Sequence, residues 1–204
     1  MKKNKVIILT MYLLIMISIA GCKSKASNVG KIVPAVLTKA EESMLELVGK
    51  EREYDIYDYN LGDNVKSVQI WLEAYNRGEK IEDVGPLSLQ QLNGKQGRIA
   101  IGLNQDRDFA WTITLQHDEG KSSYSFVTDS KEEIYKEFGY GGTKLVEETD
   151  IKSGEDIVLY VIMFNKSNVM SIYDPQEYAQ EPKKLKQYDF VYILKCRFLE
   201  DDPS

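Results

Sequence analysis

The sequence predicts an all-β protein, an antiparallel β-sandwich of about seven to nine strands with one or two short helices. Short runs rich in β-branched and aromatic residues follow one another from residue 54 to residue 199, and clusters of Gly, Asn, Asp and Ser separate them. In several runs apolar and polar residues alternate, as they do in strands with one buried face and one wet face. A barrel fits the same pattern and is the alternative fold.

The chain begins with the three parts of a secretory signal peptide. Lysines within the first five residues form a basic start, residues 6–18 form an apolar run, and Ala20-Gly21 offers small side chains for cleavage. The apolar run is too short for a transmembrane helix, which takes about 20 apolar residues. Residues 1–21 are therefore predicted to be a signal peptide.

Cys22 directly follows these small residues. The stretch Ile19-Ala20-Gly21-Cys22 resembles the lipobox of bacterial lipoproteins. The resemblance implies a diacylglyceryl group on the Cys22 sulfur, cleavage before this residue, and a mature protein anchored in lipid on the extracytoplasmic face of the cell membrane. Two acyl chains pass the point at which one chain alone binds a membrane only marginally.

Charge argues against one class of partner. The chain has 26 basic and 32 acidic side chains, a net charge of −6. Loss of residues 1–21 removes three lysines and no acid, so the net charge of the mature chain falls to −9. Nucleic acids are held mainly by clustered Lys and Arg, so nucleic acid is not an expected partner.

The mature chain is predicted to have two parts. Residues 22–33 are expected to form the lipidated cysteine and a flexible tether, because residues 23–33 are polar and show no apolar period. Residues 34–204 are long enough for one domain with a hydrophobic core.

Two short helices are expected. Thr38-Lys39-Ala40-Glu41 matches a capping box. The apolar residues Ala40, Met44, Leu47 and Val48 then recur at spacings of three and four, which predicts a helix over 39–48 that packs on the main body. A second capping signature at Ser130-Lys131-Glu132-Glu133 predicts another short helix before Gly139.

The candidate strands share a β-rich composition and turn residues at their ends: 54–60, 65–75, 98–103, 109–116, 123–128, 145–151, 157–164, 169–173 and 190–199. Residues 157–164 are apolar on both faces, which predicts a central strand covered on both sides. Cys196 falls in the apolar register of the last strand and is expected to be a buried, inert thiol. Residues 139–142 are interpreted as a flexible turn.

One aromatic surface is a candidate ligand site. The first two strands are predicted to pair as a hairpin with Ile56 opposite Ile70, which would place Tyr57, Tyr59 and Trp71 together on the other face. Flat aromatic side chains on an exposed sheet can stack on sugar rings, so a cell-surface glycan is the ligand expected for this face. The alternative is that a helix or the second sheet covers it.

Residues that carry catalysis are scarce. His117 is the only histidine and lies in a predicted hairpin tip, outside any Ser-His-Asp pattern. Zinc needs three or four ligands that this chain does not group, and the acids of two loops (Asp106, Asp108, Asp118 and Glu119) match no calcium-loop spacing. No metal or cofactor is therefore predicted.

The protein is expected to be a non-catalytic binding or interaction domain whose partner is a glycan or an envelope protein. A cell-envelope hydrolase and an envelope-sensing accessory protein are the alternatives.

A second resemblance concerns the body of the chain. Residues 57–70, 97–101 and 185–192 look like parts of uncharacterised secreted or lipid-anchored proteins of low-GC Gram-positive bacteria. The resemblance implies an extracytoplasmic location and an all-β architecture, and it implies no activity.

Overall fold

The computed structural model describes residues 29–48, 53–92, 94–104, 110–117, 120–127, 137–167 and 169–200. The predicted signal peptide, Cys22, the four acidic loop residues and the capping signature of the second predicted helix lie outside these ranges. No helix in the described ranges is long and apolar enough to cross a membrane.

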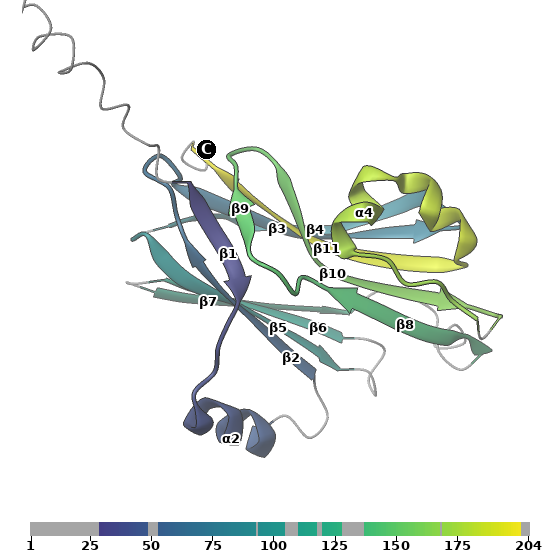
Figure 1. Ribbon diagram of the computed structural model, residues 1–204, viewed down its shortest axis with the longest axis horizontal. Helices are drawn as coiled ribbons and strands as arrows, with labels where there is room; N and C mark the ends of the chain where they lie inside the picture. The colour runs from purple at the N-terminus through teal and green to yellow at the C-terminus, as the bar shows by residue number, and fades with distance from the viewer. Residues whose placement is uncertain are drawn as a thin grey trace, which may run out of the picture.

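Two antiparallel sheets face each other and confirm the predicted β-sandwich (Figure 1). Sheet A contains β1 (Gly30–Pro34), β2 (Glu53–Asn60), β5 (Gln96–Asn104), β6 (Ala110–His117), β7 (Gly120–Val127) and β9 (Thr149–Ile151), in the order β7-β6-β5-β2-β1-β9. Sheet B contains β3 (Ser67–Asn76), β4 (Glu79–Gln91), β8 (Gly139–Lys144), β10 (Asp156–Asn165) and β11 (Phe190–Leu199), in the order β4-β3-β11-β10-β8.

The main core lies between the two sheets. Alternation along β6 buries Trp111, Ile113 and Leu115, as the sequence predicts. The facing strands of sheet B contribute Leu194, Cys196 and Phe198, among others. Cys196 is a free, fully buried thiol, which confirms its predicted position.

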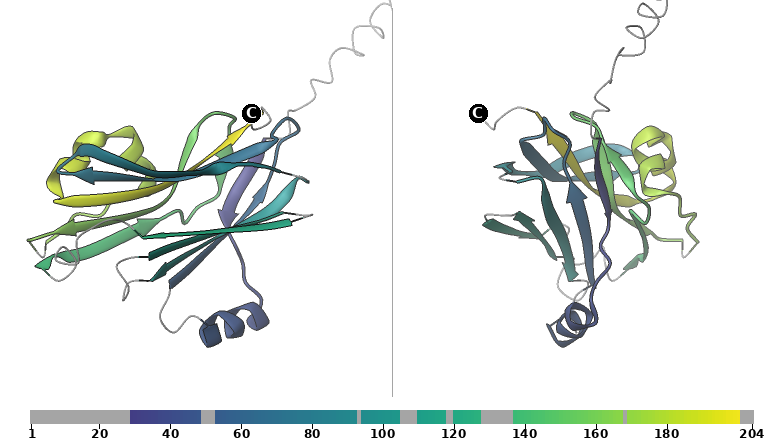
Figure 2. Two further views of the ribbon diagram at one scale, coloured as in Figure 1. Left: turned by 180° about the vertical axis from the view of Figure 1, so that it is seen from behind. Right: turned by 60° about the vertical axis from the view of Figure 1, so that its left-hand side comes forward.

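A second, smaller core covers the part of the outer face of sheet B formed by β10 and β11. Strand β10 is buried over nearly its whole length, as predicted, because α4 (Pro175–Gln180) and the 3₁₀-helix η1 (Pro182–Gln187) pack on its other side (Figures 1 and 2). A register shift at Leu159 turns both this residue and Tyr160 toward the main core. Val158, Val161 and Met163 face the second core.

The predicted hairpin of the first two strands is wrong. Strand β2 lies in sheet A between β1 and β5, whereas β3 lies in sheet B between β4 and β11. Alternation shows which residues share a face, but both faces of β2 carry large side chains, so the pattern could not identify the inner one. Tyr57 and Tyr59 point into the main core and are only 1% and 3% exposed.

Other boundaries also differ from the prediction. The tether cannot extend to residue 33, because Gly30–Pro34 forms β1 and Ile32 is fully buried. Residues 139–142 are part of strand β8 rather than a turn, and residues 169–173 form no strand. Glycines lack the side chains from which a strand pattern is read, which explains why β8 was missed.

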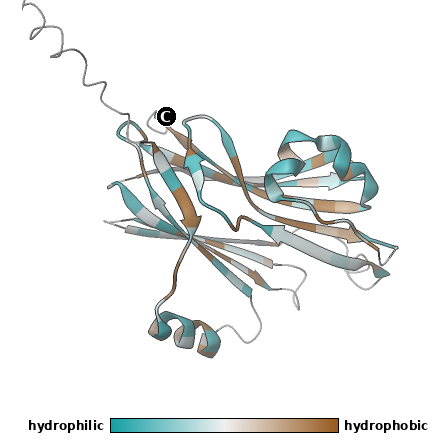
Figure 3. Ribbon diagram, viewed as in Figure 1, coloured by the Kyte–Doolittle hydropathy of each residue, from teal (hydrophilic) through white to brown (hydrophobic). Residues whose placement is uncertain are grey.

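Helix α2 (Lys39–Val48) has the predicted capping box. The backbone N and Oγ1 of Thr38 each donate to Glu41 Oε2 at 2.8 Å, and the Glu41 N donates back to Thr38 Oγ1 at 3.3 Å. The expected packing of its apolar stripe is wrong, however. The helix projects from one end of the sandwich, and Met44 and Leu47 are 59% and 74% exposed (Figure 3).

Candidate functional site

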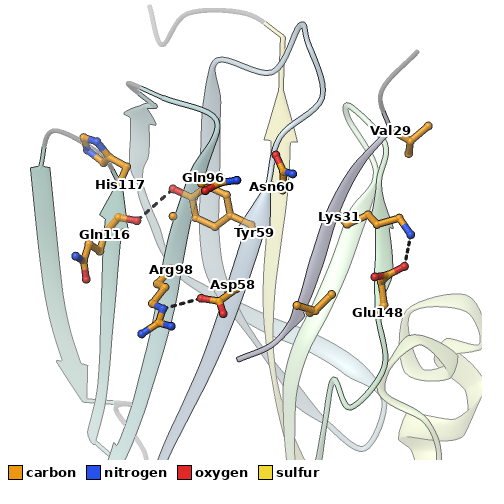
Figure 4. A pocket seen from close by; sticks show the side chains of 12 residues that line it. Val29, Lys31, Asp58, Tyr59, Asn60, Gln96, Arg98, Gln116, His117 and Glu148 are labelled. Atoms are coloured by element: carbon orange, nitrogen blue, oxygen red, sulfur yellow. Dashed lines mark hydrogen bonds and ion pairs between the residues drawn. The ribbon is translucent and has the colours of Figure 1, made fainter. Parts of the chain in front are cut away.

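An open groove of about 830 Å³ lies at one end of sheet A, mainly on its outer face (Figure 4). Its lining comes from β1, β2, β5 and β6, with one residue just before β1 and one just before β9. The lining residues are Val29, Lys31, Val33, Asp58, Tyr59, Asn60, Gln96, Gly97, Arg98, Gln116, His117 and Glu148.

Strand register brings the polar side chains together. Lys31 lies opposite Asn60, which in turn lies opposite Gln96, so these three form one row across the sheet. Asp58, Arg98 and Gln116 form the next row. Residues directly opposite each other on neighbouring strands share a face, so both rows point to the same side.

Arg98 is the central charge of the groove. Its Nε donates to Asp58 Oδ1 at 2.6 Å, and its Nη1 donates to Glu41 Oε1 of α2 at 2.5 Å. Hydrogen bonds from the Thr38 backbone and side chain, together with Arg98, lower the pKa of Glu41 to about 2. Arg98 therefore joins the strand face to the first turn of α2.

The other cation of the groove is also paired. Lys31 on β1 forms an ion pair with Glu148, and this hydrogen bond and charge raise the pKa of Lys31. Each cation of the groove thus has at least one carboxylate partner.

The amides of the groove are not paired. The side chains of Asn60, Gln96 and Gln116 are exposed and form no hydrogen bond within the described ranges. At the rim, Nδ1 of His117 is shielded from solvent and likewise has no partner among the described residues. The three exposed amides offer free donors and acceptors to a ligand, whereas the shielded Nδ1 of His117 does not.

A close backbone approach forms the floor of the groove. The Tyr59 side chain crosses beneath Gly97, and its hydroxyl donates to the backbone carbonyl of Gln116 at 3.4 Å. A Cβ on Gly97 would collide with the Tyr59 hydroxyl and with this carbonyl. Any other residue at this position would therefore displace the Tyr59 side chain and the backbone of β6.

The structure does not bring the predicted aromatic ligand face together. Tyr57 donates from its hydroxyl to the Leu159 carbonyl at 3.1 Å inside the core, and Tyr59 lies under the groove floor. Trp71 is on the outer face of sheet B, where Nε1 donates to Glu73 Oε1 at 3.2 Å. The prediction that Tyr57, Tyr59 and Trp71 share an exposed face is wrong, because β2 and β3 belong to different sheets.

Trp71 borders a compact network of charges on sheet B. Glu73 Oε2 accepts from the Tyr75 hydroxyl at 2.7 Å and lies 2.8 Å from Lys195 Nζ, and Lys80 donates to its other oxygen at 3.0 Å. Burial alone would raise the pKa of Glu73, but these hydrogen bonds outweigh it and lower the pKa to about 2. Every charged group in this network is paired, which gives it a structural role.

Other reactive groups offer little chemistry. Burial raises the pKa of the Cys196 thiol and keeps it in the unreactive, protonated form. Among the described residues, no three His, Cys, Asp or Glu side chains are grouped so that they could hold a metal ion.

Sequence reasoning missed the groove. The alternation in β5 does place Arg98 on the face opposite Ile99 and Ile101, so the sequence indicated that Arg98 lies on the exposed face. Asn60, Gln96 and Gln116 belong to no motif, and only the strand order brings them together.

A family model described as the YgaN domain matches residues 31–198. The matched region extends from β1 to β11 and includes all of the groove except Val29. No curated protein and no solved structure matches the chain. Because the family model matches most of the sequence, the chain belongs to the YgaN domain family.

Proposed function

We propose that the protein is a lipid-anchored binding domain on the extracytoplasmic face of the cell membrane, and that the groove of sheet A holds its ligand. One observation carries the proposal. Three exposed amides, Asn60 and Gln96 in one row and Gln116 in the next, line an open groove without hydrogen-bond partners in the described ranges. Convergent polar side chains in a concave surface are typical of sites for polar ligands, and each amide can both donate and accept.

The position of the groove supports the anchored arrangement. Val29 and Lys31 line the groove, and they lie where the predicted tether enters the domain. A flexible tether over residues 23–29 would span roughly 15 Å. The groove would therefore be held close to the membrane and would meet ligands at its surface.

The charges of the groove favour binding over hydrolysis. Asp58 and Glu41 share Arg98, and Glu148 pairs with Lys31. A general acid must hold a proton near neutral pH, and the pKa of Glu41 lies far below that range at about 2. An envelope hydrolase is the competing function and would show itself by turnover of envelope polymers.

The anchor is tested with the Cys22→Ala variant. Cells fed an alkyne fatty acid should label the wild-type protein and not the variant, and the variant should leave the membrane fraction or keep its leader. Label on the variant, or an unlabelled wild type, would refute the lipoprotein assignment.

The groove is tested by filling it. Gln96→Trp places a bulky side chain in the groove at an exposed strand position, where aromatic residues are tolerated. The control, Ser125→Trp, alters an exposed position on β7 of the same sheet, outside the groove. Binding of the purified lipoprotein to isolated cell envelopes should fall for the first variant only. Equal binding by both variants would place the ligand site elsewhere.

A further inference from the structure

The cations of the groove are already neutralised. Lys31 has Glu148, and Arg98 has both Asp58 and Glu41. An anionic ligand would have to displace one of these carboxylates, and the chain as a whole has a net charge of −6. The described lining of the groove therefore offers no unpaired Lys or Arg to a phosphate, sulfate or carboxylate group.

The exposed polar side-chain groups of the groove without partners in the described ranges are neutral amides, and each can both donate and accept hydrogen bonds. A side-chain amide donates through its NH₂ group and accepts through its carbonyl oxygen, and a hydroxyl group also donates and accepts. Asn60 lies directly opposite Gln96, with Cβ atoms expected to be about 5 Å apart. Such a pair can hold two neighbouring hydroxyl groups of one ligand.

The fold does not favour an extended peptide at this site. Peptides commonly bind to sheets by adding a strand to an open edge. The strands β1, β2, β5 and β6 under the groove each have a paired neighbour on both sides, so their backbone groups are already used. Recognition at this face must therefore come from the side chains.

The size of the groove fits more than one sugar ring. Its lining crosses four adjacent strands, and three spacings between neighbouring strands give about 14 Å. Two rows of polar side chains follow this direction, one through Asn60 and one through Arg98.

We infer that the groove binds a neutral, hydroxyl-rich oligosaccharide, through the amides of Asn60, Gln96 and Gln116. This inference rests on the proposed binding function of the groove. It places the glycan on the outer face of sheet A and assigns recognition to amides rather than to aromatic rings.

The test is calorimetric titration of the full-length lipoprotein in detergent micelles with three kinds of probe. The neutral probes are tetrasaccharides of N-acetylglucosamine and of glucose, the anionic probe is a sulfated tetrasaccharide, and the third probe is an uncharged ten-residue peptide. We expect a neutral tetrasaccharide to bind more tightly than the other two kinds. The double variant Asn60→Ala/Gln96→Ala should weaken this binding about tenfold or more, since it removes two sets of hydrogen bonds.

Gln69→Ala is the matched control, because this amide lies on β3, in the other sheet and outside the groove. It should leave the affinity unchanged, and equal melting temperatures of all variants would show that they fold alike. Tighter binding of the anionic probe or the peptide, or no binding of either neutral probe, would overturn the inference. So would neutral binding that the double variant does not weaken.

The outcomes separate the inference from the proposed function. If Gln96→Trp reduces envelope binding but neither neutral probe binds, the ligand class is wrong and the groove is still the site. If the envelope binding and the titrations are both insensitive to groove variants, the proposed function of the groove fails as well.

Discussion

The outer faces of the two sheets treat their polar side chains differently. On sheet B, Glu73 and Lys195 are only 6% and 7% exposed and form an ion pair with each other. On sheet A, Asn60 and Gln96 are exposed and have no hydrogen-bond partner within the described ranges. Both faces are rich in polar side chains. They differ in whether these side chains form hydrogen bonds and ion pairs with one another. Internal pairing and burial are typical of a stabilising face, as on sheet B, whereas the free hydrogen-bonding groups of sheet A support its proposed role in binding.

The cover on sheet B strengthens this contrast. The hydroxyl groups of Tyr178 and Tyr188 lie 3.0 Å apart, and the Tyr178 hydroxyl also contacts the sulfur of Met163 at 3.6 Å. Tyr178 lies in α4 and Tyr188 directly follows η1, and this segment covers the apolar part of the face. No helix of the described ranges covers the groove of sheet A in the same way; α2 reaches its edge only through Glu41.

The largest expected effect follows from removal of this cover. Tyr178→Ala leaves a cavity above β10 and deprives Tyr188 of a hydrogen-bond partner. The free energy of unfolding, measured by urea denaturation, should fall by about 4 kcal/mol. Tyr140→Ala, at a half-exposed position on β8, should cost much less. Equal losses would mean that α4 contributes little to stability.

A smaller loss is expected from the buried ion pair. Lys195→Met keeps most of the side-chain volume but removes the charge that faces Glu73. The free energy of unfolding should fall by about 3 kcal/mol, because the carboxylate loses its most buried partner. A variant as stable as the wild type would show that the pair does not stabilise this face.

Acid should weaken the same network. The pKa of Glu73 is lowered to about 2 in the folded protein, so its contribution is fully present above the ordinary glutamate pKa of 4.5 and is lost as the pH falls from there toward 2. Denaturation curves between pH 5 and pH 2 should show a steeper loss of stability for the wild type than for Glu73→Gln. Parallel curves would assign the acid sensitivity to other groups.

Loss of an ion pair on the outer face of sheet A should lower the free energy of unfolding less than loss of the Glu73–Lys195 pair. Arg98→Met removes the partner of Asp58 and Glu41, which are about one-third exposed. Exposed ion pairs contribute little, so the expected loss is about 1 kcal/mol. Hydrogen exchange should nevertheless increase in α2, since Arg98 joins its first turn to the sheet. Unchanged exchange in residues 41–48 would contradict this link.

The smallest effect is expected at the amides. Asn60→Ala/Gln96→Ala should change the free energy of unfolding by no more than about 0.5 kcal/mol per site, because neither side chain has a hydrogen-bond partner among the described residues. Thermal denaturation checks this expectation. A clear loss of stability would mean that these side chains support the fold, and the contrast between the faces would weaken.

Local patterns predicted much of the fold. Alternation identified β2, β5, β6 and β11, the double-sided apolar run identified β10 as a covered central strand, and the Thr38 capping box located α2. These features depend on neighbouring residues in the chain, so a short window of sequence contains them.

The candidate site depends on contacts that no window contains. Lys31, Asn60, Gln96 and Gln116 share a face only because β1, β2, β5 and β6 are neighbours in sheet A. The same missing information led to the wrong face for Tyr57 and Tyr59. Polar residues at every second position are common on any strand with one solvent-exposed face. The sequence alone could therefore not distinguish a groove from an ordinary surface.

The location of β1 also determines how the domain would respond to force. This strand directly follows the predicted tether and lies between β2 and β9, antiparallel to both. A pull directed along β1 from its N-terminal end would load its lateral hydrogen bonds together, in shear, instead of opening them one after another. If the domain is anchored to the membrane through β1, this strand would resist unfolding when a ligand bound in the groove pulls the domain away from the membrane.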